Sequence, residues 1–187
     1  WQEYARHLYA RLGPATRHAL RHDILPTAHD IDGDPWPPSM ACISSNLDEL
    51  HGDGWLVNQA RMWLASQWSV RSGAPWQDGE NEFFTHLLDG SRAANRLGWQ
   101  WTAGAATGRV YGFSRSQVER RAPELCRRCA LAEHCPIEDW PDDPPLEPAD
   151  EHPLLRSDPD PDGTGGPHVP VATGTPSGRR VPVLLLP

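Results

Sequence analysis

All nine tryptophans of this 187-residue chain lie at or before Trp140, and no aromatic residue follows that position. Thirteen of the 20 prolines, by contrast, lie at or after Pro136. A segment without bulky apolar side chains cannot bury enough surface to offset the entropy that it loses on ordering. We therefore expect residues 1–140 to form a folded domain and residues 141–187 to be a disordered, Pro/Asp-rich tail.

The formal net charge of −8 is shared between these two parts. The tail contains eight acidic residues and three arginines, a sum of −5, which leaves −3 for residues 1–140. Bulk charge therefore gives no sign of nucleic-acid binding, although a local basic face remains open. Five arginines cluster late in the first part, on either a solvated helix face or a phosphate-binding surface: Arg115, Arg120, Arg121, Arg127 and Arg128.

The chain shows no export or membrane signal. Its apolar C-terminal run, Val-Pro-Val-Leu-Leu-Leu-Pro, is far shorter than the roughly 20 residues that a spanning helix needs. We therefore expect a cytoplasmic protein, and its four cysteines are expected to be reduced thiols or metal ligands rather than disulfides. Because the chain begins with Trp1 rather than Met, we interpret it as a fragment of a longer reading frame.

Apolar residues recur at helical spacing over the first 140 residues. Those between Trp1 and Leu12 share one face of a helix that Gly13-Pro14 ends. Further helices are predicted over residues 15–23, 42–51, 55–70, 81–88, 91–96 and 114–123, and an irregular loop is predicted over the proline-rich residues 25–39. No run alternates in the way a strand does, so the fold class is predicted to be all-α.

Two polar, tryptophan-rich blocks contain residue types suited to a binding site. The block Gly54-Trp-Leu-Val-Asn-Gln-Ala-Arg-Met62 precedes Asp89-Gly-Ser-Arg-Ala-Ala-Asn95, and Gly98-Trp-Gln-Trp-Thr-Ala-Gly104 follows at once. Arg61 and Asp89 can pair across two helices where water is excluded and each charge needs a partner. The Asn95 amide can donate to or accept from the edge of a heteroaromatic ring. Taken alone, the same residues also suit a tryptophan-rich core with one interhelical salt bridge.

In order and spacing, these blocks resemble the flavin-binding domain of DNA photolyases and cryptochromes. That family has a Trp-Arg-Glu-Phe-Tyr-like helix start, a Gly-Trp-x-x-Asn-Arg-x-Arg-Met block, a Trp ahead of a Gly-Glu pair, and an Asp-Gly-Asp-x-Ala-x-Asn-x-x-Gly-Trp-Gln-Trp block. The corresponding parts of this chain are Trp1-Gln-Glu-Tyr4, Gly54 to Met62, Trp76 with Gly79-Glu80, and Asp89 to Trp101. The resemblance covers residues 1 to about 108. It implies that residues 1–140 are the C-terminal part of a helical, all-α FAD-binding domain of photolyase/cryptochrome type.

The resemblance also implies a cofactor site. Asn95 would face flavin N5, and Asn58 would reach the flavin and the DNA lesion. Arg61 and Asp89 would form an ion pair against the isoalloxazine ring. The cofactor implied by these residues is FAD.

Electron transfer and DNA binding are implied in the same way. Trp99 and Trp76 would be the near and middle members of an electron-transfer chain. The family's outer tryptophan has no counterpart at the expected distance, and Trp36 is the available substitute. A cavity for a flipped pyrimidine dimer would be lined by Trp1, Met62 and Trp101.

The chain departs from the family pattern at three points. The segment that clamps the flavin phosphates and the antenna-binding domain both precede position 1. Ser91 replaces a carboxylate expected near the polar edge of the flavin, and Arg92 adds a positive charge beside it. Gln59 replaces an arginine expected near the DNA phosphates. These changes suggest that flavin binding persists more readily than efficient dimer repair.

The cysteines suggest a second cofactor. Cys126-Arg-Arg-Cys129 is a turn whose two thiolates can bind one metal centre, and Cys135 precedes Pro136, as is also seen around iron–sulfur clusters. Cys42 supplies the fourth ligand that a 4Fe-4S cluster needs. The placement resembles that of a four-cysteine cluster in one bacterial branch of the photolyase family, although that branch has a longer gap before its last cysteine. Zinc in a closed tetrahedral site and unligated thiols remain alternatives.

Together, these features lead us to expect a monomeric, light-driven flavoprotein whose reduced FAD repairs pyrimidine dimers in damaged DNA, without a membrane partner. A cryptochrome-like blue-light photoreceptor that binds FAD without repair is the rival hypothesis. A degenerate remnant without cofactor is a third, against which the retained site residues argue: Asn58, Arg61, Asp89, Asn95, Trp99 and Trp101.

Overall fold

The computed structural model describes residues 2–24, 33–141 and 145–148 of the chain. All regular elements within these residues are helical, and one isolated β-bridge joins His22 to Pro148. The all-α prediction is therefore confirmed for this part of the chain. Trp1, most of the loop predicted over 25–39 and most of the tail predicted over 141–187 lie outside the described residues.

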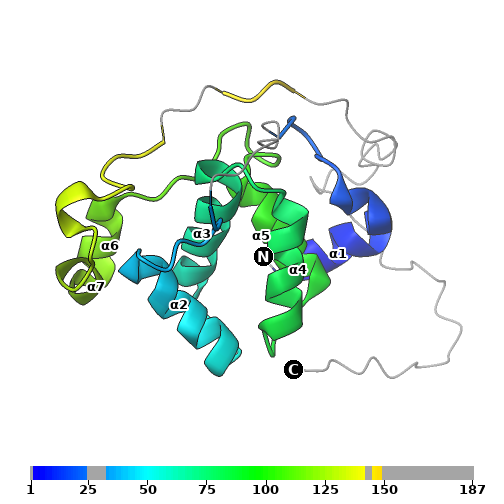
Figure 1. Cartoon of the computed structure of the whole chain (residues 1–187). Coiled ribbons are helices and arrows are strands. Elements are labelled where there is room, and N and C mark those ends of the chain that lie inside the picture. The colour runs from blue at the N-terminus through cyan, green and yellow to red at the C-terminus, as the bar shows by residue number, and fades with distance from the viewer. Residues whose placement is uncertain (1, 25–32, 142–144, 149–187) are drawn as a thin grey trace, which may run out of the picture.

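Seven α-helices make up the described fold (Figure 1). Their bounds are α1 Gln2–Leu12, α2 Ala41–Gly52, α3 Asn58–Ser66, α4 Trp76–His86, α5 Arg92–Thr102, α6 Arg115–Arg121 and α7 Pro123–Arg127. Short 3-10 turns cover Gly13–Arg17 and Ala132–His134, and a π-helical turn covers Gln67–Arg71. No described helix is long and apolar enough to cross a membrane.

Helix α5 is central because it packs against α1, α3 and α4. Ala93 and Leu97 on one side of α5 join a core formed with α1. Trp99 belongs to a second, larger core that extends over α2, α3 and α4. Helices α6 and α7 pack on each other, with α7 against α2, and lie at the opposite end of the molecule from α1 (Figure 1).

Several predicted helix bounds were wrong for local physical reasons. The helix predicted from 15 to 23 is limited to the 3-10 turn, because the N–H groups of Arg21 and His22 donate to the Ala105 carbonyl instead of to a helix. The helix predicted from 55 begins at Asn58, since Val57 is extended. Helix α5 continues through Gly98 to Thr102 rather than ending near residue 96.

Helix α4 begins at Trp76, directly after Pro75, rather than at residue 81. Gly79 lies inside its first turns because the Trp99 ring occupies the space that a side chain would need. A Cβ atom added to Gly79 would lie 2.2 Å from the Trp99 ring. The glycine that lowers helix propensity is therefore required by packing between α4 and α5.

The described residues 145–148 contact the folded body. Leu146 is buried, and its N–H donates to the Gly108 carbonyl at 2.9 Å. Gly104, with φ +89°, leaves room for the Leu146 side chain, because an added Cβ would lie 2.5 Å from it. The proposed domain boundary at residues 140/141 stays a prediction.

Candidate flavin-ring cavity and cysteine cluster

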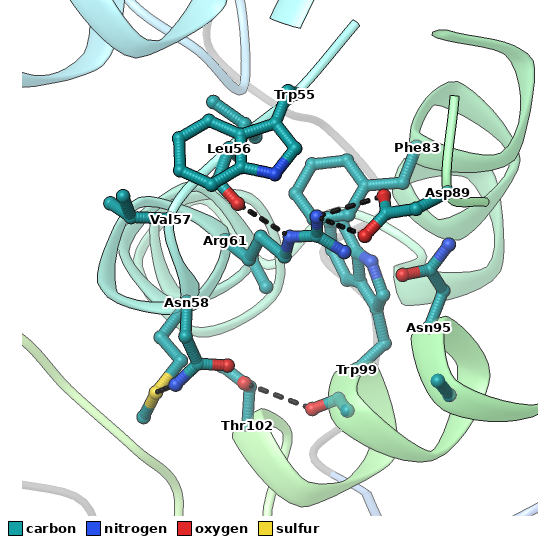
Figure 2. Close-up of a pocket in the computed structure, with 14 residues that line it drawn as sticks. Trp55, Leu56, Val57, Asn58, Arg61, Phe83, Asp89, Asn95, Trp99 and Thr102 are labelled. Atoms are coloured by element: carbon teal, nitrogen blue, oxygen red, sulfur yellow. Dashed lines mark hydrogen bonds and ion pairs between the residues drawn. The ribbon is translucent and has the colours of Figure 1, made fainter. Parts of the chain in front are cut away.

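A cavity of about 280 Å³ lies between α3, α4 and α5, beside the extended residues 55–57 (Figure 2). Its lining is Trp55, Leu56, Val57, Asn58, Arg61, Met62, Ala65, Phe83, Asp89, Ala94, Asn95, Gly98, Trp99 and Thr102. Mostly apolar walls with a few convergent polar groups are typical of small-molecule sites, whose volumes run from roughly 300 to 1,000 Å³. This cavity has the size of a ring system rather than of a whole dinucleotide.

Arg61 and Asp89 form an ion pair at the edge of this cavity. The Arg61 Nη2 atom lies 2.9 Å from both Asp89 carboxylate oxygens, and Nε donates to the Leu56 carbonyl at 3.0 Å. The Arg61 side chain is 21% exposed and that of Asp89 is 50% exposed. Because water reaches the exposed half of Asp89, the ion pair contributes little to the stability of the fold. Its main effect is to orient the Arg61 guanidinium.

Asn95 presents an unsatisfied amide to the cavity. Its side chain is 5% exposed, and Nδ2 has no hydrogen-bond partner among the described residues. Leaving a buried donor unpaired costs roughly 1–3 kcal/mol, so such a group calls for an explanation. In Figure 2, Asn95 and Asp89 lie on one side of the cavity and Asn58 on the other. An acceptor on a bound ring would satisfy the Asn95 donor.

Trp99 forms the floor between these polar groups and is 1% exposed. Its ring lies against Gly79, and Phe83 makes an edge contact with it at 5.1 Å between ring centroids. The Trp99 Nε1 atom is also buried without a partner among the described residues. The ring is thus held by α4 and carries a second free donor.

Aromatic rings continue from Trp99 into the core. Phe83 stacks on Trp36 at 6.2 Å, and Trp36 contacts Trp68 at 4.6 Å. Trp76 is buried at the start of α4 but is not part of the cavity lining. The structure therefore connects Trp36 to the site through Phe83, and Trp68, which sequence reasoning did not single out, extends this series.

The three residues expected around a flipped dimer are not gathered at this cavity. Met62 lines it, and its Sδ atom lies 3.3 Å from Asn58 Nδ2. Trp101 is outside the lining and contacts Tyr111, with 5.3 Å between ring centroids. Trp1 lies outside the described residues.

The departures from the family pattern at positions 91 and 92 lie outside the cavity lining. Ser91 is the N-cap of α5, and its Oγ accepts from the Ala94 N–H at 3.3 Å. Arg92 Nη1 binds Glu80 at 2.8 Å and Asn81 at 2.7 Å, away from the cavity. Arg92 is therefore held by Glu80 on α4, and its expected position near the polar edge of the flavin stays a prediction. Gln59 is partly buried and also lies outside the lining.

The four cysteines lie together although 84 residues separate Cys42 from Cys126. Cys42 lies in the first turn of α2, Cys126 on α7, and Cys129 and Cys135 in the segment that follows. All four line one small cavity of about 20 Å³, with Arg115, Leu125, Ala132 and Ile137 as further lining. Contact between α2 and α7 brings the distant cysteine to the other three.

Burial affects two of these thiols. It raises the pKa of Cys42 to about 12, with further contributions from Cys129, Cys135 and Cys126. Burial is also the largest cause that raises the pKa of Cys126, and the nearby charge of Glu119 raises it further. A raised pKa favours the protonated form of Cys42 and Cys126, and binding of a metal by these two thiols would release their protons.

Some arginines of the basic cluster are used within the fold. Arg115 pairs with Glu119 at 2.8 Å and Glu138 at 3.1 Å, and hydrogen bonds to Glu119 and Glu138 raise its pKa. Arg127 pairs with Glu124, and Arg128 donates to Ser45. A solvated, structural role accounts for these three.

Residues 40–122 match the family model described as the FAD binding domain of DNA photolyase. The segment contains the whole cavity lining, so the class of protein that fold and site define is a flavin-binding helical domain. Residues 40–122 are thus similar to the FAD binding domain of DNA photolyase.

Among the relatives are several deoxyribodipyrimidine photo-lyases. That of Streptomyces griseus is 37% identical over 65 residues, which cover 35% of this chain and 14% of the relative. That of one Thermus thermophilus strain is 44% identical over 63 residues, or 33% of this chain and 15% of the relative. That of a Synechococcus strain is 36% identical over 96 residues, or 44% and 20%. The chain thus spans at most a fifth of these relatives' length.

Proposed function

We propose that this chain is the ring-binding part of a photolyase-like flavoprotein whose reduced FAD donates an electron to pyrimidine dimers in DNA. The observation that carries the proposal is the unpartnered Asn95 donor, buried in a cavity beside Trp99 and the Arg61–Asp89 pair. The names of the relatives support the lyase activity and the DNA substrate. A monomeric state and a cytoplasmic location stay predictions.

The residues present fit a flavin ring. When bound, the flavin supplies redox chemistry that no side chain can perform. Asn95 offers the amide donor that a ring nitrogen needs, and the Arg61 guanidinium, oriented by Leu56 and Asp89, offers positive charge at the ring face. Leu56, Phe83 and Trp99 exclude water from the other sides.

Riboflavin tests this proposal directly, because it carries the ring without the phosphates. Binding to the 187-residue chain is measured by quenching of riboflavin fluorescence. Asn95→Leu should weaken binding about tenfold, because it removes about 1.4 kcal/mol of hydrogen bonding. Gln77→Leu, an amide loss outside the cavity, is the matched control. A folded chain that does not bind riboflavin, or equal affinities for wild type and Asn95→Leu, would contradict the proposal.

The photoreceptor remains the rival function. It is favoured by Gln59, which removes a positive charge expected at the DNA phosphates, and by Trp101, which lies outside the cavity lining. The test is illumination of the longer protein with chemically reduced FAD and dimer-containing DNA. Light-dependent loss of dimers supports repair, and binding that does not distinguish damaged from undamaged DNA supports the photoreceptor.

We further propose that Cys42, Cys126, Cys129 and Cys135 bind a 4Fe-4S cluster. Tetrahedral zinc, with bonds of about 2.3 Å, would hold its sulfurs about 3.8 Å apart. Among the described residues, no three cysteine sulfurs lie within 4.8 Å of one another. The absence of such a group favours a centre larger than one zinc ion, and four thiolates are what a 4Fe-4S cluster needs.

Anaerobic purification tests the cluster. The protein should be brown, with broad visible absorption beyond that of flavin and about four irons per chain, as a four-thiolate cubane requires. Cys126→Ser should abolish the iron without changing riboflavin binding, since the two sites share no lining residue. Stoichiometric zinc, or four titratable thiols and no metal, would contradict the assignment.

A further inference from the structure

A third group of potential ligands lies away from both sites. His51 is in the last turn of α2, and Glu82 and His86 lie one turn apart on α4. One ligand atom from each of the three lies within 4.8 Å of the other two. The two imidazole rings are 4.5 Å apart between centroids, and His86 Nε2 is 3.6 Å from Glu82 Oε2. The ends of the two helices meet along one edge of the molecule (Figure 1).

The donor set and its geometry suit one metal ion. Two imidazoles and a carboxylate, with a solvent-filled fourth position, are a known zinc ligand set. With bonds of about 2.0–2.1 Å, tetrahedral zinc holds neighbouring donors about 3.3 Å apart. The His86–Glu82 pair, at 3.6 Å, is already near that separation, and a ligand atom of His51 lies within 4.8 Å of both. Side-chain exposures of 36% for His86 and 47% for Glu82 leave a path for the hydrated ion.

We propose that His51, Glu82 and His86 bind a zinc ion that fastens the end of α2 to the end of α4. The site does not depend on flavin binding or on the cysteines, because its ligands belong to neither lining. Imidazole and carboxylate ligands suit zinc better than magnesium or calcium, which prefer oxygen donors alone.

The fastened junction leads directly into the ring cavity. Four residues after His51, Trp55 begins the lining, and three residues after His86, Asp89 joins it. The two segments already meet where the Leu88 N–H donates to the Gly54 carbonyl at 2.8 Å, and Gly54, with φ +66°, packs against Leu88. A metal ion at this junction would therefore favour the arrangement in which Arg61 reaches Asp89.

Zinc binding to the tag-free, 187-residue chain is measured by competition with a chromophoric chelator. His86→Gln should remove one equivalent of bound zinc, or weaken that site by more than about tenfold. His7→Gln, on an exposed position of α1, is the matched control and should bind as wild type does. Glu82→Gln, which keeps shape and helix propensity, gives a second reading if His86→Gln folds poorly.

Cobalt(II) separates this site from the cysteines. Thiolate ligands give an intense near-ultraviolet charge-transfer band, which imidazole and carboxylate ligands do not. The cobalt ion that wild type binds and that His86→Gln and Glu82→Gln do not bind should contribute visible absorption bands but no charge-transfer band. Melting of the zinc-loaded wild type should occur about 5–10 °C above the metal-free form at 100-fold excess over the dissociation constant, and this rise should shrink in both variants. Equal zinc content in wild type and both variants, or no metal outside the cysteines, would overturn the proposal.

Discussion

Glu80 is a buried carboxylate whose removal should destabilise the domain. Its side chain is 0% exposed and binds two arginines of α5, Arg92 at 2.8 Å and Arg96 at 3.3 Å. Arg96 is itself only 4% exposed, and its other contacts are Thr16 and the Tyr9 ring. In Glu80→Gln the shape is kept, but Arg96 is left as a buried charge without a counter-charge.

The expected loss of stability in Glu80→Gln depends on how deeply Arg92 and Arg96 are buried. Removing one partner of a buried ion pair costs about 3–5 kcal/mol. Arg92, whose side chain is 29% exposed, can turn to water, so the low end of that range applies, about 3 kcal/mol. The exposed pair of Glu3 with Arg6, at 76% and 56% exposure, is the matched control. Glu3→Gln should cost under about 1 kcal/mol, as exposed pairs do.

Urea unfolding followed by circular dichroism measures both variants. Glu80→Gln should lower the midpoint with an unchanged slope, and the melting temperature should fall by roughly 6–12 °C, at about 2–4 °C per kcal/mol for a domain of this size. Glu3→Gln should be superimposable on wild type. If the two variants behave alike, Arg92 and Arg96 do not depend on Glu80 and the reasoning fails.

Three further predictions concern the proposed sites. In the longer protein, Trp99→Phe should slow light-driven reduction of oxidised FAD by more than about tenfold, because an activation barrier raised by about 1.4 kcal/mol already gives that factor. If electrons pass through the ring series that contains Phe83, Trp36→Phe should slow the reduction more than Trp76→Phe does. If Trp101 meets a flipped base, Trp101→Ala should weaken binding to dimer-containing DNA by roughly one to two decades, whereas equal effects on undamaged DNA would indicate a packing role. In metal-free protein, alkylation of the Cys42 thiol should keep accelerating above about pH 10, because burial raises its pKa to about 12 whereas an ordinary thiol is almost fully ionised by that pH. A rate that levels off near that pH would contradict this.

The sequence predicted the parts of the site that depend on one helix or on a fixed motif. Arg61, Asp89 and Asn95 reach the same cavity because each occupies a set position relative to the start of α3 or α5. Trp99 was expected in an electron-transfer chain and Trp101 in the lining of a cavity for a flipped dimer, but residues two apart on a helix point about 160° apart. Only Trp99 can therefore face this cavity, and Trp101 meets Tyr111 on the other side.

Contacts between distant segments could not be predicted in the same way. The spacing of Glu82 and His86 marks one helix face, but nothing in the sequence places His51, 31 residues before Glu82, beside it. Arg92 was expected near the flavin because it lies within a motif that also contains residues of the ring site. Its partner in the structure, Glu80, lies on a different helix, and the sequence does not reveal that pairing. Long-range packing of α2 and α5 on α4 decides both cases.

The dipeptide Gly79-Glu80 shows how packing and chemistry are joined in this fold. Gly79 admits the Trp99 ring, and Glu80 holds Arg96, so adjacent residues of α4 fix two different faces of α5. Trp99 lies one turn from Asn95, and Arg96 is the residue that follows Asn95. The register of α4 against α5 therefore sets where the Asn95 amide and the Trp99 ring meet in the cavity. A methyl group at position 79 would displace the Trp99 ring, which lines the cavity, so this glycine sets the shape of the cavity although it is not part of the lining.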